Sequence, residues 1–172
     1  VTGKQKEAVD VVRGKALVMA GQNVERLDRL PLGSRWGKER GADVQVVMTA
    51  GAREFVTPLT MQNLSGHPVF TDTFDSSQDQ HYGHLTLAKW ADLFVIAPAT
   101  ADLLARIKAG LGNDAVTTTL LAFRGPVLLA PAMNTAMWDH AETQANVTAL
   151  LAQPKYRMVG PASGPLADGE IG

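Results

Sequence analysis

Hydroxyl and amide side chains stand in the turns that follow short apolar runs of this chain. The candidates are Thr49, Thr100, Asn134 and Ser163, each close behind such a run. These side chains offer neutral hydrogen bonds, and the small residues around them let a ligand approach the backbone. The same residue types also cap helices and form turns, so one such turn alone does not indicate a site. Four of them at one edge of a fold would favour a binding site there.

The apolar runs have the character of buried parallel strands. They cover residues 16–20, 44–48, 93–97 and 127–130, with a fifth candidate at 157–159. They do not alternate between apolar and polar residues, as expected when helices cover both faces of a parallel sheet. Helical spacing predicts helices at 53–64 (with Pro58 near its start or at a bend), 102–109, 114–122 and 135–152. The alternation predicts an α/β fold, namely a doubly wound, Rossmann-like, mostly parallel sheet in three α/β/α layers within a single domain. Ligands of such sheets bind at the carboxyl ends of the strands, where the four turns would meet.

The composition excludes several classes of function. The chain has 172 residues, of which 45% are hydrophobic and 19% charged, as expected for one domain with a buried core. The net charge of −1 argues against nucleic acid or an anionic membrane as a partner. Because cysteine is absent, a disulfide scaffold, a thiolate metal site and a cysteine nucleophile are excluded, and we expect no metal. No apolar run is long enough to span a bilayer and the first residues lack a signal-peptide core, so we expect a cytoplasmic protein.

Three segments resemble the signature motifs of a known family. They are Gly83–Asp92 (GHLTLAKWAD), Ala97–Leu103 (APATADL) and Pro131–Trp138 (PAMNTAMW). In this order and spacing they are similar to the motifs of the flavin-containing cysteine decarboxylases, most of all in the branch that serves coenzyme A biosynthesis. The resemblance runs from about residue 41 to the last residue. It makes residues 1–172 one flavoprotein decarboxylase domain in which residues 1–40 are atypical.

The resemblance implies an FMN-dependent carbon–carbon lyase that converts 4'-phospho-N-pantothenoylcysteine to 4'-phosphopantetheine. In that chemistry FMN takes a hydride from the carbon that bears sulfur, and the resulting thioaldehyde accepts the electrons released as CO₂ leaves. The reduced flavin then returns the hydride. The resemblance also implies that FMN binds near a subunit boundary of a homo-trimer, or of a dodecamer built from trimers.

The resemblance assigns roles to individual residues. His84 matches the active-site histidine, whose imidazole can exchange protons near neutral pH or hold the substrate. Asn134 matches the amide that holds the substrate carboxylate, because a neutral group orients it without opposing its loss as a cation would. Met137 is implied in substrate binding, and Met133 and Trp138 belong equally well to the core. The residues implied to line FMN are Thr49, Thr100, Ala101, Asp102, Leu103 and Ala132.

Two segments depart from the family pattern. Where relatives have a glycine-rich turn for the FMN phosphate, this chain has a single glycine, and Glu25 and Asp28 would oppose a phosphate. Asp168 takes the place of a cysteine that donates a proton in the final reduction. A carboxyl with an ordinary pKa of ~3.9 is almost wholly ionised at pH 7. Asp168 could therefore serve as the acid only if burial raised its pKa.

Two other functions stay open on the sequence. The missing cysteine favours an oxidative decarboxylase that releases an enethiol from the C-terminal cysteine of a peptide. The match of Gly83–Asp92 and Pro131–Trp138 to the coenzyme A branch opposes that alternative. The altered residues 16–40 would also permit a non-catalytic regulatory subunit, although such a subunit has no evident need for both His84 and Asn134.

Overall fold

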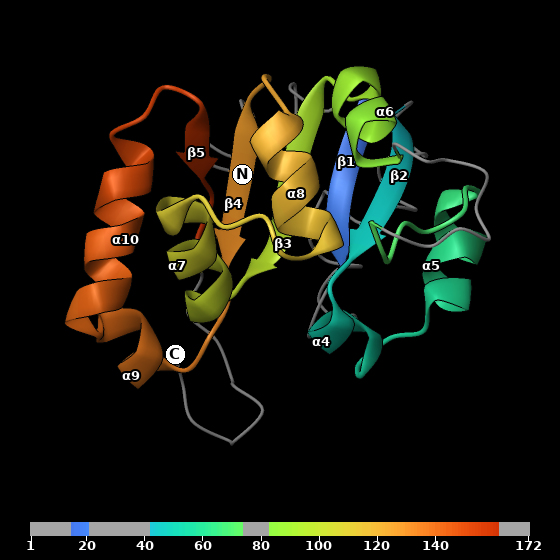
Figure 1. Cartoon of the computed structure of the whole chain (residues 1–172). Coiled ribbons are helices and arrows are strands. Elements are labelled where there is room, and N and C mark those ends of the chain that lie inside the picture. The colour runs from blue at the N-terminus through green and yellow to red at the C-terminus, as the bar shows by residue number, and fades with distance from the viewer. Residues whose placement is uncertain (1–14, 21–41, 74–82, 162–172) are drawn as a thin grey trace.

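A parallel β-sheet forms the centre of the computed structural model, which describes residues 15–20, 42–73 and 83–161 (Figure 1). The strands of this part are β1 (Lys15–Ala20), β2 (Asp43–Met48), β3 (Leu93–Ala99), β4 (Val127–Pro131) and β5 (Tyr156–Met158). They are ordered β2-β1-β3-β4-β5, and each neighbouring pair is parallel. A parallel bridge from Val47 to Phe70 extends the sheet on the outer side of β2.

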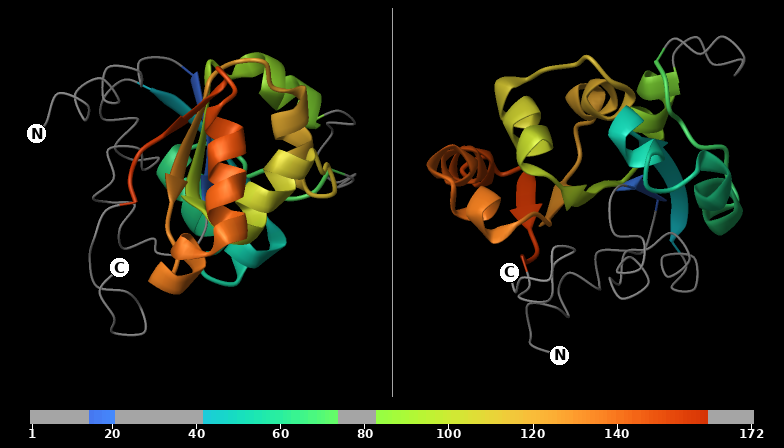
Figure 2. Two further views of the ribbon diagram at one scale, coloured as in Figure 1. Left: turned by 90° about the vertical axis from the view of Figure 1, so that its left-hand side faces the viewer. Right: turned by 90° about the horizontal axis from the view of Figure 1, so that it is seen from below.

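Seven helices surround the sheet in the described ranges. They are α4 (Ala50–Arg53), α5 (Pro58–Ser65), α6 (Gly83–Trp90), α7 (Ala101–Ala109), α8 (Ala115–Ala122), α9 (Thr135–Asp139) and α10 (Ala141–Leu151). Helices α6, α7, α8 and α10 lie on one face of the sheet, and α5 lies beside β2 (Figures 1 and 2). The predicted single α/β domain with a Rossmann-like parallel sheet is confirmed.

Both faces of the central strands are buried, which explains their continuous apolar sequences. All seven residues of β3 and all five of β4 are buried. Alternate side chains enter two separate apolar clusters: Phe94, Ile96, Val127 and Leu129 join the first, and Val95, Ala97, Leu128 and Ala130 join the second. The second cluster also contains Met61 of α5, whereas Leu59 on the same helix is exposed.

Strands β3 and β4 continue further than the sequence predicts. β3 runs through Pro98 to Ala99, and β4 ends at Pro131. The pairing register of the two strands shifts between Ile96 and Ala99. A proline has no N–H to donate to a sheet ladder, so it is tolerated at irregular or terminal positions such as these.

The helix predicted at 53–64 is shorter in the structure, where α5 begins at Pro58, as the sequence allowed. The helix predicted at 135–152 is divided into α9 and α10, so the prediction of one continuous helix there is wrong. Pro58 is the first residue of α5, after the N-cap Thr57. His140 adopts an extended conformation (φ −60°, ψ 133°) between α9 and α10. The buried face of α10 consists of Thr143, Val147 and Leu150. Helix α6 was not predicted from the sequence.

Candidate active site

The turns that contain most of the predicted site residues lie at one edge of the sheet. Thr49 follows β2, Thr100 follows β3, and Asn134 lies three residues after β4. Because these strands are parallel, their carboxyl ends point the same way, toward the bottom of Figure 1. Helices α4, α7 and α9 begin at these turns and are seen from below in Figure 2.

Each of the three side chains caps the helix that it precedes. Thr49 Oγ1 accepts a hydrogen bond from the Ala52 N–H at 3.1 Å, and Thr100 Oγ1 accepts one from the Leu103 N–H at 3.3 Å. Asn134 Oδ1 accepts from the Ala136 N–H at 2.8 Å. Since Oδ1 faces the helix, the amide group of Asn134 turns its NH₂ donor side away from the cap. The caps therefore fix the orientation of the hydroxyl and amide groups at this edge of the sheet.

The first turn of α7 contains the cap Thr100 and the carboxylate of Asp102, whose charge is balanced by Arg106. Asp102 is exposed, and its Oδ2 accepts a hydrogen bond from Arg106 Nε at 2.8 Å. This pair reduces the repulsion that Asp102 would exert on an anion at the helix N-terminus. The side chain of Leu103 is buried in the core, so only its backbone is available to a ligand. Ala101 is half-buried and Ala132 is exposed.

His84 does not belong to the turns at the carboxyl edge of the sheet. It is the second residue of α6, which lies over the β1–β2 half of the sheet near the end where the strands begin. In Figures 1 and 2 helix α6 lies far from helix α9, whose N-cap is Asn134. In one copy of the chain, the helix that contains His84 is therefore separate from the helix that Asn134 caps.

Two buried polar atoms lack a hydrogen-bond partner within the described ranges. They are Nδ1 of His84 and Oγ1 of Thr135, the residue after Asn134. Leaving such an atom unpaired costs about 1–3 kcal/mol, so these are places where a ligand or another chain would supply a partner. The unpaired hydroxyl of Thr135 was not predicted, because the sequence offers no signal for it beyond its place within the third motif.

The carboxyl edge fits a flavin by its donor set and its open space. It presents hydroxyl, carboxamide and backbone N–H groups, which suit the neutral polar atoms of such a ligand. Gly51, the second residue of α4, is exposed, and a Cβ added there would meet nothing within 4 Å. The unpaired Thr135 hydroxyl lies at the same edge.

The remaining predicted residues divide between the surface, the core and the undescribed ranges. Met137 is 49% exposed, whereas Met133 and Trp138 are partly buried and pack against the larger core cluster. Asp168, Ser163 and the atypical turn with Glu25 and Asp28 lie outside the described residues. No group of three or more His, Cys, Asp or Glu side chains that could hold a metal occurs among the residues described. No helix in that part of the chain is long and apolar enough to cross a membrane.

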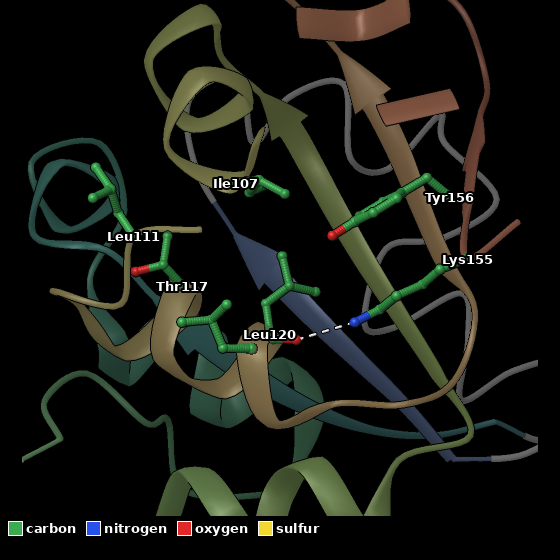
Figure 3. A pocket seen from close by; sticks show the side chains of 7 residues that line it. Ile107, Leu111, Thr117, Leu120, Lys155 and Tyr156 are labelled. Atoms are coloured by element: carbon green, nitrogen blue, oxygen red, sulfur yellow. Dashed lines mark hydrogen bonds between the residues drawn. The ribbon is translucent and has the colours of Figure 1, made fainter. Parts of the chain in front are cut away.

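A separate pocket of about 80 Å³ lies between the end of α7, α8 and the start of β5 (Figure 3). Lys155 Nζ donates hydrogen bonds to the carbonyl oxygens of Leu120 (3.2 Å) and Phe123 (2.5 Å) at the end of α8. Burial lowers the pKa of Lys155 and raises the pKa of the neighbouring Tyr156. The pocket residues are Ile107, Leu111, Thr117, Leu120, Leu121, Lys155 and Tyr156. They include none of the predicted site residues, so Lys155 is best explained as a cap for α8.

Comparison with known proteins identifies relatives of this chain. The bifunctional coenzyme A biosynthesis protein CoaBC of Vibrio vulnificus is 53% identical over 135 residues, which are 78% of this chain and 33% of that protein. CoaBC of Escherichia coli K12 is 48% identical with the same coverage. The chain thus spans about a third of the length of these relatives.

Solved structures give a consistent result. The FMN-dependent cysteine decarboxylase SpaF is 34% identical and superimposes with a TM-score of 0.71, covering 88% of this chain and 85% of that one. A PPC decarboxylase mutant complexed with pantothenoylaminoethenethiol is 27% identical, with a TM-score of 0.77 and coverage of 93% and 88%.

A family model described as Flavoprotein matches residues 16–172. This match includes residues 16–40, a segment in which the sequence contains no motif typical of the family. The resemblance to the flavin-containing cysteine decarboxylases is confirmed. The chain belongs to the flavoprotein family.

Proposed function

We propose that this chain is an FMN-dependent decarboxylase that converts 4'-phospho-N-pantothenoylcysteine to 4'-phosphopantetheine in coenzyme A biosynthesis. The observation that carries the proposal is the 53% identity over 135 residues to a protein named for that pathway. A stretch of about that length in a chain of 172 residues necessarily includes His84. The likeness to a PPC decarboxylase structure supports the same reaction.

FMN would be held at the carboxyl edge of the sheet. When bound, it would supply a hydride acceptor for the substrate carbon next to sulfur and return the hydride after CO₂ has left. The hydroxyls of Thr49 and Thr100 can donate hydrogen bonds while their oxygens cap α4 and α7. The residues proposed to line FMN are Thr49, Thr100, Ala101, Asp102, Leu103 and Ala132.

Asn134 and His84 would act on the substrate. The NH₂ side of Asn134 donates to the carboxylate and holds it without the ion pair that would stabilise it against loss. Exposed Met137, one turn along α9, adds an apolar contact to the substrate. The His84 imidazole holds the substrate or takes the proton of its thiol. Asp168 is proposed as the acid of the final protonation.

We propose that the complete site forms between copies of the chain in a homo-trimer, or in a dodecamer built from trimers. In one copy, α6, which contains His84, lies apart from α9, which Asn134 caps (Figures 1 and 2). An adjoining copy would bring the two groups together and give His84 Nδ1 a partner. Residues 1–172 would act as one decarboxylase domain, in the cytoplasm, with a small-molecule substrate.

The reaction is tested by incubating the purified protein with FMN and 4'-phospho-N-pantothenoylcysteine and measuring CO₂ and the product mass. Phosphopantetheine is the expected product. A product two hydrogens lighter, with reduced flavin accumulating, would instead indicate the enethiol reaction proper to the related peptide-modifying branch. Bound FMN without any loss of CO₂ would reject the decarboxylase proposal and favour a regulatory subunit.

The shared site is tested by mixing two inactive variants, His84→Asn and Asn134→Ala, after subunit exchange. If each site takes His84 from one copy and Asn134 from another, about a quarter of the sites in equal, random mixtures regain both residues. Recovery of activity toward that level supports the proposal. Mixtures that stay inactive, although mass spectrometry shows mixed oligomers, would contradict it.

A further inference from the structure

We infer that Phe70 and Gly83 form a positioning contact that holds the His84 imidazole in place for catalysis. The inference rests on the role proposed for His84. Neither Phe70 nor Gly83 is among the residues predicted to form the site, and neither is proposed to touch substrate or FMN. The contact joins the outer side of the sheet to the first turn of α6.

Phe70 is fixed to the sheet by its backbone. Its N–H donates to the carbonyl oxygen of Val46 at 2.9 Å, and its own carbonyl oxygen accepts from the Met48 N–H at 2.9 Å. Its side chain is buried in the same cluster as Leu87 and Ala88 of α6. The ring is therefore a rigid surface against which α6 packs.

Gly83 allows α6 to approach this ring more closely than any other residue would. A Cβ at Gly83 would lie 2.7 Å from Cε2 and 3.2 Å from Cζ of Phe70. Real Cβ contacts are not that short, so a methyl group would force the ring or the helix end to move. Because the backbone of Phe70 is hydrogen-bonded to β2, we expect the start of α6 to shift, and with it His84, the residue after Gly83.

Hydrogen bonding does not orient His84 through its buried nitrogen. Active-site histidines commonly have one ring nitrogen fixed by a hydrogen bond, which sets the ring's orientation. In the described part of the chain, Nδ1 of His84 is buried and has no such partner. Within one copy of the chain, packing at the start of α6 is then what holds the residue that carries the ring, and at Gly83 the helix lies against the Phe70 ring.

The test is a double-mutant cycle with Gly83→Ala, Phe70→Leu and the combined variant. Gly83→Ala is expected to lower kcat about 10- to 100-fold, because displacing a catalytic group by about 1 Å has an effect of that order. KM and FMN affinity should change less than about twofold, since the carboxyl edge is untouched. In the combined variant the smaller Leu side chain makes room for the methyl group, so most of kcat should return.

Two glycines provide matched controls. At Gly125 an added Cβ would lie 2.5 Å from Phe123 Cζ, so Gly125→Ala should lower the melting temperature but leave kcat unchanged. At Gly112 an added Cβ would lie 2.7 Å from the end of the exposed Leu121 side chain, which can turn away. Gly112→Ala should therefore change neither the melting temperature nor kcat. If Gly125→Ala lowered kcat as much as Gly83→Ala, the effect would be one of stability and the inference would fail.

If Gly83→Ala does not fold, the inference is tested with Phe70→Leu and the combined variant. Phe70→Leu alone loosens the contact and should lower kcat several-fold. Adding Gly83→Ala then refills the gap and should raise kcat again. Unchanged kcat in Phe70→Leu, or no recovery in the combined variant, would overturn the inference.

A readout without turnover separates this inference from the proposed function. The imidazole NMR signal of His84, assigned by its loss in His84→Asn, should shift in Gly83→Ala and return in the combined variant. An inactive wild type with this pattern would reject the decarboxylase proposal but keep the positioning contact. If the wild type is active but the His84 signal does not change in Gly83→Ala, the decarboxylase proposal stands and the positioning contact is rejected.

Discussion

The candidate groups at the carboxyl edge and the one on α6 are held in different ways. Thr49, Thr100 and Asn134 each accept a hydrogen bond from a backbone N–H two or three residues ahead. His84 lacks a partner for its buried Nδ1 among the described residues and sits beside a packing contact to Phe70. Local hydrogen bonds thus orient the first group, and packing across the fold orients the second.

This difference predicts how each region responds to substitution. A capping side chain has a structural and a ligand-binding role at once, so changing it should alter both stability and binding. His84 contributes no hydrogen bond through Nδ1 to the described fold, so its loss should affect chemistry far more than stability. Substitutions that separate stability from activity therefore test the comparison directly.

The largest effect is expected for His84→Asn. Loss of a general acid–base group typically lowers the rate 10²- to 10⁴-fold, and we expect a fall of about that size in kcat with little change in the melting temperature. Steady-state kinetics and thermal unfolding measure the two quantities. His140→Asn is the matched control, because His140 is exposed and asparagine can keep its cap on α10. Equal turnover in the wild type and His84→Asn would remove His84 from the mechanism.

Asn134 permits a separation of its two roles. Asn134→Asp keeps an oxygen that can accept from the Ala136 N–H, so stability should hold, but it presents a negative charge to the substrate carboxylate. We expect KM to rise about 10-fold or more, since a hydrogen bond to a charged group contributes about 1.5–3 kcal/mol. Asn134→Ala should show a similar KM and also lose about 1 kcal/mol of stability with the cap. Wild-type kinetics in Asn134→Asp would mean that Asn134 is only a cap.

The same contrast explains what the sequence could and could not predict. Strand positions and the polar turns after them follow from local patterns, and the observed β2, β4 and β5 begin and end within one residue of prediction. The break at His140 was missed because a helical pattern continues across it while the backbone turns extended for one residue.

The separation of His84 from Asn134 could not be predicted from local patterns either. It depends on the strand order β2-β1-β3-β4-β5, which places β4 and α9 away from the β1–β2 half that α6 covers. Motif order along the chain contains no information on that distance. The Phe70–Gly83 contact is similarly invisible, because it joins a strand bridge and a helix start through packing alone.

A smaller effect is expected at Thr100. Thr100→Val removes the cap on α7 and the hydroxyl proposed to face FMN, so we expect a loss of about 1 kcal/mol in stability and a several-fold weaker FMN affinity. Thr100→Ser should retain both. Thr57→Val is the control, since it removes an equivalent cap on α5 and should lower stability without changing FMN affinity. Flavin titration and thermal unfolding measure these effects, and equal FMN affinity in all three variants would exclude Thr100 from the flavin site.

The smallest effect is expected for Lys155→Met, in the pocket of Figure 3. The substitution loses hydrogen bonds to Leu120 and Phe123 but also removes a partly buried charge, so stability at pH 7 should change by no more than about 1 kcal/mol.

The pH dependence of stability gives this variant a sharper signature. Burial lowers the pKa of Lys155 in the folded chain, so between that pKa and 10.5 the unfolded chain binds more protons and stability rises with pH. Lys155→Met should abolish this rise, which denaturant unfolding at several pH values below 10.5 would show. Tyr156, whose pKa is raised, acts in the opposite sense only above pH 10. Decarboxylase activity should be unchanged, because the pocket contains none of the proposed site residues. A fall in kcat would show that the end of α8 influences the active site. It would then be incorrect to explain the site only by the capping hydrogen bonds at the carboxyl edge and the packing of α6.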